Sequence, residues 1–399
     1  TNVAVLNMML HFIVKSKLYN EDFIRDRTEG FDNFLKEIER QDVDHLAKVA
    51  GVDKQLVKEA AIAYATAKNS MEFHGLGVTE HEQGSKTVML IADLAMITGN
   101  IGRKGVGVNP LRGQNNVQGA ADMGCQPHQG AGYFEVADEK NQKFYSEKYG
   151  VTHPTKAGLK IPQMFDAAIK KEIKGIWIIG EDIVQTDPNS AHVVEAMNSL
   201  ELLVVQEIFM SETAKLATVV LPGTTFLEKD GTFTNTERRV QRVNRAVPPL
   251  PGTKPDGVIV TDMMQKLGFD QPDYDADQVL AEIADIVPFF KGITRERLGK
   301  FGLQWPVKED GTDTQILHTE EFKLGKGRLK SFDWKESTEI KNNQKDYPLI
   351  LTTSRVLQHY NAATMTRRTN NINIVDEDVL LIHPKDAADR DLNTGDIGR

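Results

Sequence analysis

Hydrophobic residues recur every three to four positions through much of the first hundred residues, as in helices that bury one face. The segment DKQLVKEAAIAYATAK begins with Asp53, a favourable helix N-cap, and SKTVMLIADLAMITGN ends beside Gly99, a typical C-terminal cap residue. We therefore predict that residues 1–68 are mainly helical, that 71–75 form a short strand, and that a long helix ends near Gly99.

A different pattern begins near residue 161. Three short apolar runs, GIWIIG (175–180), LLVVQ (202–206) and ATVVLP (217–222), alternate with helix-like segments. This spacing predicts right-handed βαβ units, and continuous apolar runs are typical of parallel strands buried on both faces. The predicted fold class is α/β, with parallel-sheet, dinucleotide-binding-like domains and flanking helices. The pair Asp230-Gly231 predicts a hairpin turn just afterwards.

Changes of pattern divide the chain into four expected regions, and Thr1 in place of an initiator Met suggests a piece of a longer protein. The apolar run YPLILTT (347–353) predicts the first strand of a further domain. The expected regions are a helix-rich α/β part (1–113), the parallel α/β part (114–250), a helical and irregular connector (251–345), and a further C-terminal region that opens with a strand (346–399).

Composition narrows the possible functions. The net charge of −9 argues against a nucleic-acid partner, which would need a basic face. No apolar run reaches the length of a membrane span, and no secretory signal is visible. The single cysteine, Cys125, excludes an internal disulfide and a cysteine-ligated zinc or iron–sulfur centre within the chain. These features fit a cytoplasmic protein.

The loop NPLRGQNNVQGAADMG (109–124) surrounds one cation, Arg112, with side-chain amides, including those of Gln114 and Gln118. A guanidinium among amides can bind a small carboxylate through two parallel hydrogen bonds. The alternative is an ordinary turn, with Arg112 capping a helix or pairing on the surface.

Polar residues follow the predicted strands at their carboxyl ends, where open parallel sheets bind ligands. Carboxylates and amides there could accept hydrogen bonds from a ribose or from a guanine edge. The alternative is that Asp187, Asn189 and Ser211 cap helices and that the loop charges lie in solvent. The phosphate fingerprint G-x-G-x-x-G is absent. The residues concerned are Gly180, Glu181, Asp182, Asp187, Gln206 and Glu207.

The histidines are scattered and show no metal-binding spacing. The segment VLQHYNAATMTRRT (356–369) combines His359, Tyr360, Asn361 and two adjacent arginines after an apolar run. It could be a surface turn or could contact a ligand with several oxygen atoms. We therefore predict no metal ligand in this chain.

Taken in order, these motifs resemble the catalytic subunit of molybdenum- or tungsten-dependent formate dehydrogenases, within the family that binds a bis-(molybdopterin guanine dinucleotide) cofactor. NPLRGQNNVQGA is the motif specific to formate dehydrogenases, whereas EKDGTFTNTERRVQ is shared more widely in the family. The resemblance covers almost the whole chain. The other matching segments are GLGVTEHEQG, IIGEDIVQTDPN, VVQEIFMSETAKLATVVLP and LTTSRVLQHYNAATMTRRT.

The resemblance implies that Arg112 holds the formate carboxylate and that Gln114 lies in the same site. It implies that 1–113 carries the substrate arginine, that 114–250 binds the guanine nucleotide, and that 346–399 begins the barrel that closes over the cofactor. By the same resemblance the cofactor contacts are Leu76, Gly77 and Glu80 near a pterin; Gly180, Glu181, Asp182, Thr186, Asp187, Gln206, Glu207 and Gly223 around the guanine nucleotide; and Arg355, His359, Tyr360 and Asn361 on pterin and phosphate groups.

The family's four-cysteine [4Fe–4S] motif is absent, because the chain has a single cysteine. The metal-ligating cysteine or selenocysteine is absent too, because Cys125 comes after the arginine loop and not before it. They are expected in a missing N-terminal region, with formate and electron-transfer subunits or that missing part as partners. We expect this chain alone to be inactive. The alternatives are a relative acting on another oxyanion and an inactive fragment that binds cofactor or subunits.

Overall fold

The computed structural model describes residues 1–397 and forms two compact units. Unit 1 comprises Thr1–Gly158, Phe226–Val247 and Pro272–Ile350. Unit 2 comprises Leu159–Thr225, Pro248–Gln271 and the chain from Leu351 onward. The domain boundaries expected from the sequence stay predictions, and residues 398–399 of the last expected region lie outside the described part.

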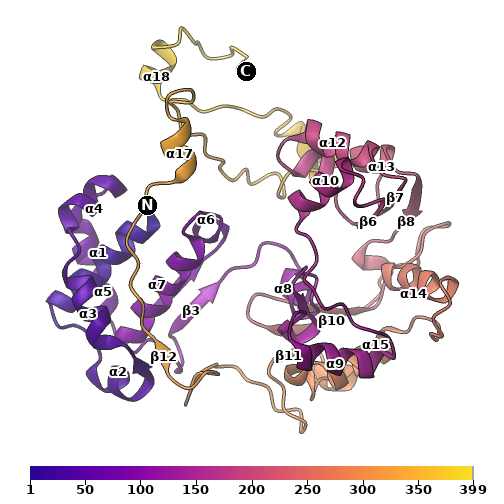
Figure 1. The fold of residues 1–399 in the computed structure, drawn as a ribbon, viewed down its shortest axis with the longest axis horizontal. Coiled ribbons are helices and arrows are strands. Elements are labelled where there is room, and N and C mark those ends of the chain that lie inside the picture. Colours follow the sequence, from indigo (N-terminus) through magenta and orange to yellow (C-terminus); the bar gives the residue numbers. More distant parts are fainter. Residues whose placement is uncertain (398–399) are drawn as a thin grey trace. The chain divides into compact units, whose positions relative to one another are not determined.

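Unit 1 is rich in helices and holds several short strands (Figure 1). Its helices are α1 (Asn2–Lys15), α2 (Glu21–Arg27), α3 (Phe31–Glu39), α4 (Val43–Ala50), α5 (Lys54–Thr66), α6 (Leu76–Thr79), α7 (Gly84–Ile97), α8 (Val117–Asp122), α9 (Glu139–Tyr149), α15 (Ala276–Ile286), α16 (Arg295–Leu298) and α17 (Thr338–Asn343), with 3-10 turns η1 (Ala131–Tyr133), η2 (Phe226–Glu228) and η3 (Pro288–Phe290). Its strands are β1 (Thr28–Glu29), β2 (Met71–His74), β3 (Gly107–Pro110), β4 (Gln129–Gly130), β5 (Phe134–Glu135), β9 (Gly231–Thr234), β10 (Arg239–Val243), β11 (Leu303–Gln304) and β12 (Gly327–Arg328).

The apolar helix α1 is the centre of the first hydrophobic core. It packs against α3, α4, α5 and α7, and its residues Leu10 and Ile13 are fully buried (Figure 1). Burial of such aliphatic side chains stabilises the fold by roughly 1.5–3 kcal/mol each. The predicted helices are confirmed, and Gly99 has the positive φ of 67° that ends a helix in the left-handed region.

Strands β2 and β3 are parallel neighbours, with Met71 opposite Gly107 and His74 opposite Pro110. The short strand predicted at 71–75 is therefore confirmed. Because the two strands run in the same direction, the segments that follow His74 and Pro110 start at the same edge. That edge leads into α6 on one side and into the arginine loop on the other.

The predicted hairpin exists, but the prediction of its turn was wrong. β9 pairs antiparallel with β10, and the turn spans residues 235–238. Arg238 supplies a positive φ of 65° there. Asp230 instead lies at the open end of the hairpin, where its side chain accepts a hydrogen bond from Arg245 N at 3.1 Å.

A second core lies under this hairpin and includes Val240, Phe290 and Ile293. Tyr145 of α9 belongs to it, although that helix was not predicted. α9 is mostly polar, so its hydrophobic pattern is weak. Its end signals were available, because Asp138 caps its N-terminus and Gly150 ends it in the left-handed conformation.

Unit 2 contains the predicted parallel sheet, in the order β6–β7–β8. This confirms the α/β class. Its elements are α10 (Ile161–Ile169), β6 (Gly175–Ile179), α11 (Ile183–Thr186), α12 (Ser190–Asn198), β7 (Leu202–Glu207), α13 (Glu212–Lys215), β8 (Val219–Pro222), α14 (Asp256–Lys266), η4 (Thr366–Arg368), η5 (Asn370–Asn373) and α18 (Pro384–Ala388).

Only one face of this sheet is well covered. Ile178, Leu203 and Val205 are buried together with residues of α10 and α12. On the other face, Ile179 and Leu202 are about half exposed. The prediction of burial on both faces was therefore wrong within the described residues, because the apolar run does not show whether a second helical layer is present.

The prediction of a strand at 347–353 was also wrong. Among residues 346–397 the structure has no strand, and Ile350 and Leu351 are highly exposed. A strand needs a neighbour for its backbone N–H and C=O groups, and none of the described residues supplies one here. The segment is apolar, but residues 346–397 do not form the paired strands with which a β-barrel would begin.

Within residues 1–397, no helix combines the length and the apolar character that crossing a lipid bilayer requires.

We predict that replacing Glu72 by Gln stabilises the chain at high pH. Glu72 on β2 accepts a hydrogen bond from the Tyr64 hydroxyl of α5, and burial raises the pKa of Glu72 to about 7. Because the pKa is raised on folding, the folded state favours the protonated carboxyl, and wild-type stability falls as pH rises from about 4.5 to about 7. The gain in Glu72→Gln should be near zero at pH 4.5 and on the order of 2–3 kcal/mol at pH 8.

Urea unfolding at the two pH values measures this gain. Glu59→Gln, an exposed carboxylate on α5, is the control and should show no such pH dependence. Equal effects of Glu72→Gln at both pH values would refute the burial argument.

Candidate functional site

Arg112 lies two residues after the end of β3, and the β9–β10 turn, distant in sequence, holds its backbone. Arg112 N donates to the Thr236 hydroxyl at 3.0 Å, and that hydroxyl donates to Pro110 O at 2.8 Å. The motif NPLRGQNN and the motif TFTNTERR thus meet in one unit. Thr236 fixes the point where the chain leaves the strand and so fixes the origin of the Arg112 side chain.

The Arg112 side chain has one protein partner in the described residues. Its Nε donates to Gln118 Oε1 at 3.0 Å, whereas its two terminal nitrogens make no hydrogen bond or ion pair within residues 1–397. Gln118 is buried on α8, and Arg112 and Gln114 are exposed. No hydrogen bond joins Gln114 to Arg112 in this part of the chain, and the prediction that Gln114 lies in the same site stays a prediction.

Four polar residues behind Arg112 were not predicted as site residues, or were named only in passing. Gln118 Nε2 donates to Asp122 Oδ1 at 2.8 Å and to the Tyr133 hydroxyl oxygen at 2.9 Å. Trp305 Nε1 donates to Asp122 Oδ2 at 2.9 Å. Gln118 and Asp122 are four residues apart in a helix, a spacing that places them on one face and that the sequence does reveal.

His74, at the end of β2, is another residue that sequence reasoning missed. It is 7% exposed, and its Nδ1 has no hydrogen-bond partner among the described residues. Burial, with a contribution from the charge of Arg112, lowers the pKa of His74. Both effects favour the neutral form of the imidazole near the guanidinium.

The predicted pterin residues lie at the same edge as Arg112. Leu76 and Gly77 belong to α6, which starts after β2, and Glu80 ends it. Leu111 N donates to His74 O at 2.7 Å across the two strands. Leu76 is exposed, and a side chain at Gly77 would meet no atom within 4 Å. The two predicted sets of residues are thus adjacent and accessible.

The predicted nucleotide residues lie in unit 2, where the carboxyl ends of β6, β7 and β8 share one edge. This confirms that both predicted loops start at the same end of the sheet. Gly180 has a positive φ of 66° and open space where a Cβ would be. Gly223 N donates to Glu207 O at 3.0 Å, so the loop after β8 joins the loop after β7. Thr186 donates its hydroxyl to Asp182 O at 3.2 Å.

Asp182 has a structural role in this edge. It is 5% exposed and accepts four hydrogen bonds, from Thr213 N (3.0 Å), Thr213 Oγ1 (2.7 Å), Gln185 Nε2 (2.9 Å) and Glu212 N (3.4 Å). These bonds tie the loop after β6 to the N-terminus of α13. The carboxylate is therefore satisfied by hydrogen bonds from the protein. Of the residues in the capping alternative, Ser211 does cap α13, where its hydroxyl accepts a hydrogen bond from Ala214 N at 3.1 Å.

Two buried polar atoms at this edge have no such partner. Gln206 Nε2 donates to Asp256 Oδ1 at 2.7 Å, but Gln206 Oε1 is unpartnered among the described residues, although the side chain is 1% exposed. Thr224 Oγ1, in a side chain 4% exposed, is unpartnered too. Buried polar atoms are normally hydrogen-bonded, so these two point to a polar ligand. Thr224 was not predicted.

The other carboxyl groups at the edge, those of Glu181, Asp187 and Glu207, make fewer hydrogen bonds within the described residues than Asp182 does. Burial and the neighbouring Asp187 raise the pKa of Glu181, and burial raises the pKa of Asp187. Glu207 accepts a hydrogen bond from Ile208 N at 2.7 Å.

The third predicted set is in the segment after residue 350. Both ring nitrogens of His359 are used within the segment, on Thr366 Oγ1 (3.0 Å) and Val375 O (2.7 Å). Asn361 has a positive φ of 49°. Arg355 and Tyr360 are exposed. The structure brings Arg368 over the Phe209 ring, at 4.9 Å, so the segment contacts the loop after β7.

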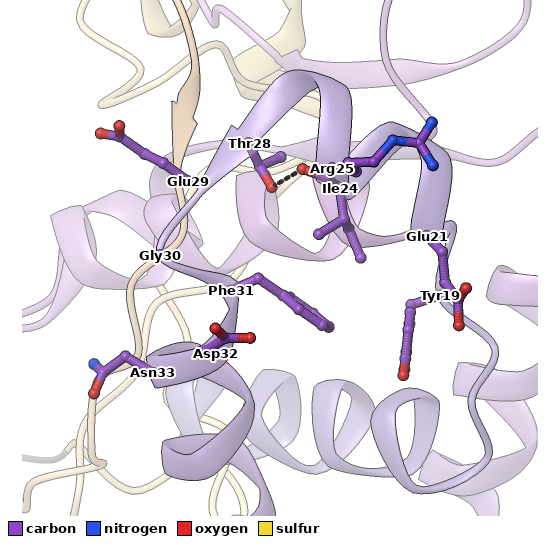
Figure 2. Close-up of a pocket in the computed structure, with 10 residues that line it drawn as sticks. All are labelled: Tyr19, Glu21, Ile24, Arg25, Thr28, Glu29, Gly30, Phe31, Asp32 and Asn33. Atoms are coloured by element: carbon purple, nitrogen blue, oxygen red, sulfur yellow. Dashed lines mark hydrogen bonds between the residues drawn. The ribbon is translucent and has the colours of Figure 1, made fainter.

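A separate hollow of about 600 Å³ lies beside α2 and α3 in unit 1 (Figure 2). The ring centroids of Tyr19 and Phe31 are 5.2 Å apart there, and Thr28 Oγ1 donates a hydrogen bond to Ile24 O. The ten lining residues drawn in Figure 2 include none of the predicted site residues. Among the described residues there is no cluster of three or more side chains suited to binding a metal.

Comparison with known proteins defines the class. A family model described as molybdopterin oxidoreductase matches residues 1–266, and one described as molydopterin dinucleotide binding domain matches residues 349–397. The chain belongs to the molybdopterin oxidoreductase family. The second match covers the segment in which the predicted strand is missing, so the resemblance there rests on sequence.

Two curated relatives are informative. The chain is 43% identical to the F420-dependent formate dehydrogenase subunit alpha of Methanocaldococcus jannaschii, over 100% of this chain and 59% of that protein. It is 36% identical to formate dehydrogenase H of Escherichia coli, over 92% of this chain and 52% of that protein. The chain therefore spans little more than half the length of these relatives.

A solved structure supports the fold. Acetylene hydratase from Pelobacter acetylenicus superposes with a TM-score of 0.71 and 19% identity, over 99% of this chain and 58% of that one. At this identity the likeness concerns the fold alone.

We predict that Asp182→Ala destabilises unit 2, because it removes a buried acceptor and leaves several donors unsatisfied. The loss should be about 3–5 kcal/mol in the free energy of unfolding, as for other broken buried networks. Asp187→Ala, five positions later, is the control, because the Asp187 side chain accepts none of these hydrogen bonds. It should change stability by roughly 0.5 kcal/mol or less. Denaturant unfolding followed by tryptophan fluorescence, to which Trp177 of β6 contributes from unit 2, measures both, and equal effects would contradict the assignment.

Proposed function

We propose that this chain is part of the catalytic subunit of a formate dehydrogenase, which oxidises formate to CO2 with release of two electrons and one proton. The observation that carries the proposal is the Arg112 guanidinium, fixed through Nε by Gln118 and with its terminal nitrogens available. The relatives named as formate dehydrogenase subunits, at 36–43% identity over nearly the whole chain, support it.

The chemistry of formate fits this arrangement. Formate has almost no apolar surface, so its binding must come from charge and hydrogen bonds. A guanidinium can hold both carboxylate oxygens and so orient the C–H bond, whereas an ammonium group offers only a point charge. Gln114 is proposed as a second polar contact. A neutral His74 beside Arg112 adds polarity without attracting a competing anion.

The proposed cofactor is bis-(molybdopterin guanine dinucleotide) with molybdenum or tungsten, supported by the two family matches. The residues present fit its polar parts: Gly180, Gln206 Oε1 and Thr224 Oγ1 would face a guanine nucleotide, and Leu76, Gly77 and Glu80 would face a pterin. When bound, the cofactor supplies the two-electron acceptor. The chain's own residues anchor it and orient the substrate.

The same proposal assigns Glu181, Asp187, Glu207 and Gly223 to the nucleotide edge, and Arg355, Tyr360 and Asn361 to the cofactor's polar groups. Asp182 and His359 act through their internal hydrogen bonds, as supports of these loops. We further propose electron-transfer subunits as partners, iron–sulfur centres outside this chain and a cytoplasmic location, the last supported by the single cysteine.

In the complete enzyme we predict that Arg112→Lys lowers kcat/KM for formate by at least about 100-fold. A lost charge-assisted hydrogen bond costs roughly 1.5–3 kcal/mol, and misalignment of the C–H bond adds to this. Metal and pterin contents should stay near normal, since Arg112 is assigned to the substrate. Steady-state kinetics with cofactor analysis test this, with the exposed Arg328→Lys as control. Unchanged kinetics, or activity lost in proportion to cofactor, would reject the role.

We also predict that the purified 399-residue chain does not oxidise formate by itself. Its only cysteine lies after the arginine loop, so it offers neither four cluster cysteines nor the expected metal ligand. Formate-dependent dye reduction should stay at background. Reduction by the chain alone, with metal and pterin detected in the sample, would show the opposite.

A further inference from the structure

A buried carboxylate lies two hydrogen bonds behind Arg112. Asp122, at the end of α8, is 0% exposed and accepts from Gln118 Nε2, the Tyr133 hydroxyl (2.7 Å) and Trp305 Nε1. All three donors are neutral, and no ion pair involves Asp122 within the described residues. Burial of a charged carboxylate without a contacting cation is costly. Burial raises the pKa of Asp122, and the three hydrogen bonds and the charge of Arg112 oppose this rise, so Arg112 is a cation that helps to compensate the cost.

The amide of Gln118 connects the two charges in one orientation. Its Nε2 donates to Asp122 and to the Tyr133 oxygen, so its Oε1 must point the other way, where it accepts from Arg112 Nε. Consecutive hydrogen bonds of this kind polarise one another. The negative charge of Asp122 thus strengthens the acceptor that Arg112 contacts. If the amide were reversed, its NH₂ group would face the guanidinium and repel it.

A carboxylate in direct contact with Arg112 would be a poor alternative. It would have the same chemistry as formate, would occupy the guanidinium and would compete for its two-nitrogen edge. In the observed arrangement only Nε is engaged within the described chain, and the terminal nitrogens stay available. The counter-charge is therefore close enough to stabilise the cation and too far away to compete with an anionic ligand.

The supports of this network are rigid. Tyr133 has a positive φ of 62°, a strained conformation for a bulky residue that persists only when its surroundings hold it. Its ring stacks on the ring of Phe289, with the two centroids 6.0 Å apart, and the Phe289 and Trp305 ring centroids are 4.6 Å apart. Burial raises the pKa of Tyr133, so its hydroxyl stays protonated and can donate to Asp122.

We propose that Asp122 is a positioning residue which, through Gln118 and with Tyr133 and Trp305, orients Arg112 for binding a small planar oxyanion. The inference rests on the proposed function in taking Arg112 as the substrate anchor. It goes further in assigning the anchor's alignment to a buried charge that acts on Arg112 through Gln118.

Equilibrium binding of nitrate to the complete, cofactor-loaded enzyme tests the proposal without formate turnover. Nitrate is planar, presents two oxygens to a guanidinium and has no C–H bond to oxidise. We expect Asp122→Asn to weaken nitrate binding at least tenfold, because Asn retains the volume but allows the Gln118 amide to reverse. In an Arg112→Lys background the same change should weaken binding less than twofold, since the group being oriented is gone.

Asp93→Asn is the matched control. Asp93 is a buried carboxyl group on α7, 1% exposed, which accepts a hydrogen bond from the backbone N of Lys330 at 3.4 Å and whose pKa burial raises to about 8. Its replacement should leave nitrate affinity within twofold of wild type. Asp122→Asn with wild-type affinity and normal cofactor content would overturn the proposal. Equal losses from Asp122→Asn in the wild-type and Arg112→Lys backgrounds would overturn it too.

If Asp122→Asn loses its cofactor, Tyr133→Phe and Trp305→Phe decide the matter, because each removes one donor to Asp122 with the ring packing largely kept. Each should weaken nitrate binding about threefold or more with cofactor retained, and wild-type affinity in both would overturn the proposal. An enzyme that shows the expected nitrate pattern but no formate oxidation would instead reject the proposed function and leave the positioning role intact.

Discussion

Parallel alignment of neighbouring strands is the constraint on which both candidate sites depend. In unit 1 it brings the chain after His74 and the chain after Pro110 to one edge, and in unit 2 it does the same for β6, β7 and β8. Parallel strands need long connections, so residues far apart in sequence become neighbours at the carboxyl ends. The loops that follow can then be polar and irregular, because the strands beneath them supply the stability.

Much of this arrangement could be predicted from the sequence, because its elements have strong local signals. The three runs of β6–β8 are short, apolar and separated by helix-length segments, and the helices up to Gly99 carry clear periodicity. The errors occurred where local pattern is insufficient. The run 347–353 has the composition of a strand, but a strand exists only with a partner, and partners are set by tertiary structure.

The site residues also fall into those that a local sequence pattern reveals and those that only tertiary contacts reveal. Arg112 is conspicuous in sequence because it is a single cation among amides. Asp122 and Trp305 are ordinary in sequence, since their meaning comes from a contact between positions 183 residues apart. Asp182 was predicted as a nucleotide contact, and that role stays a prediction. Its carboxylate accepts hydrogen bonds from Thr213 and its neighbours, whereas the buried atoms left unpartnered among the described residues belong to Gln206 and Thr224.

The four hydrogen bonds of Asp182 have a consequence for how a ligand would associate with this edge. They hold the loop after β6 against α13 before any ligand arrives. A ligand therefore does not have to order these loops, and the conformational entropy that loop ordering costs was already lost when the chain folded. Association at such a preformed edge should be limited by encounter and desolvation, and the affinity should depend weakly on loop sequence outside the contacting residues.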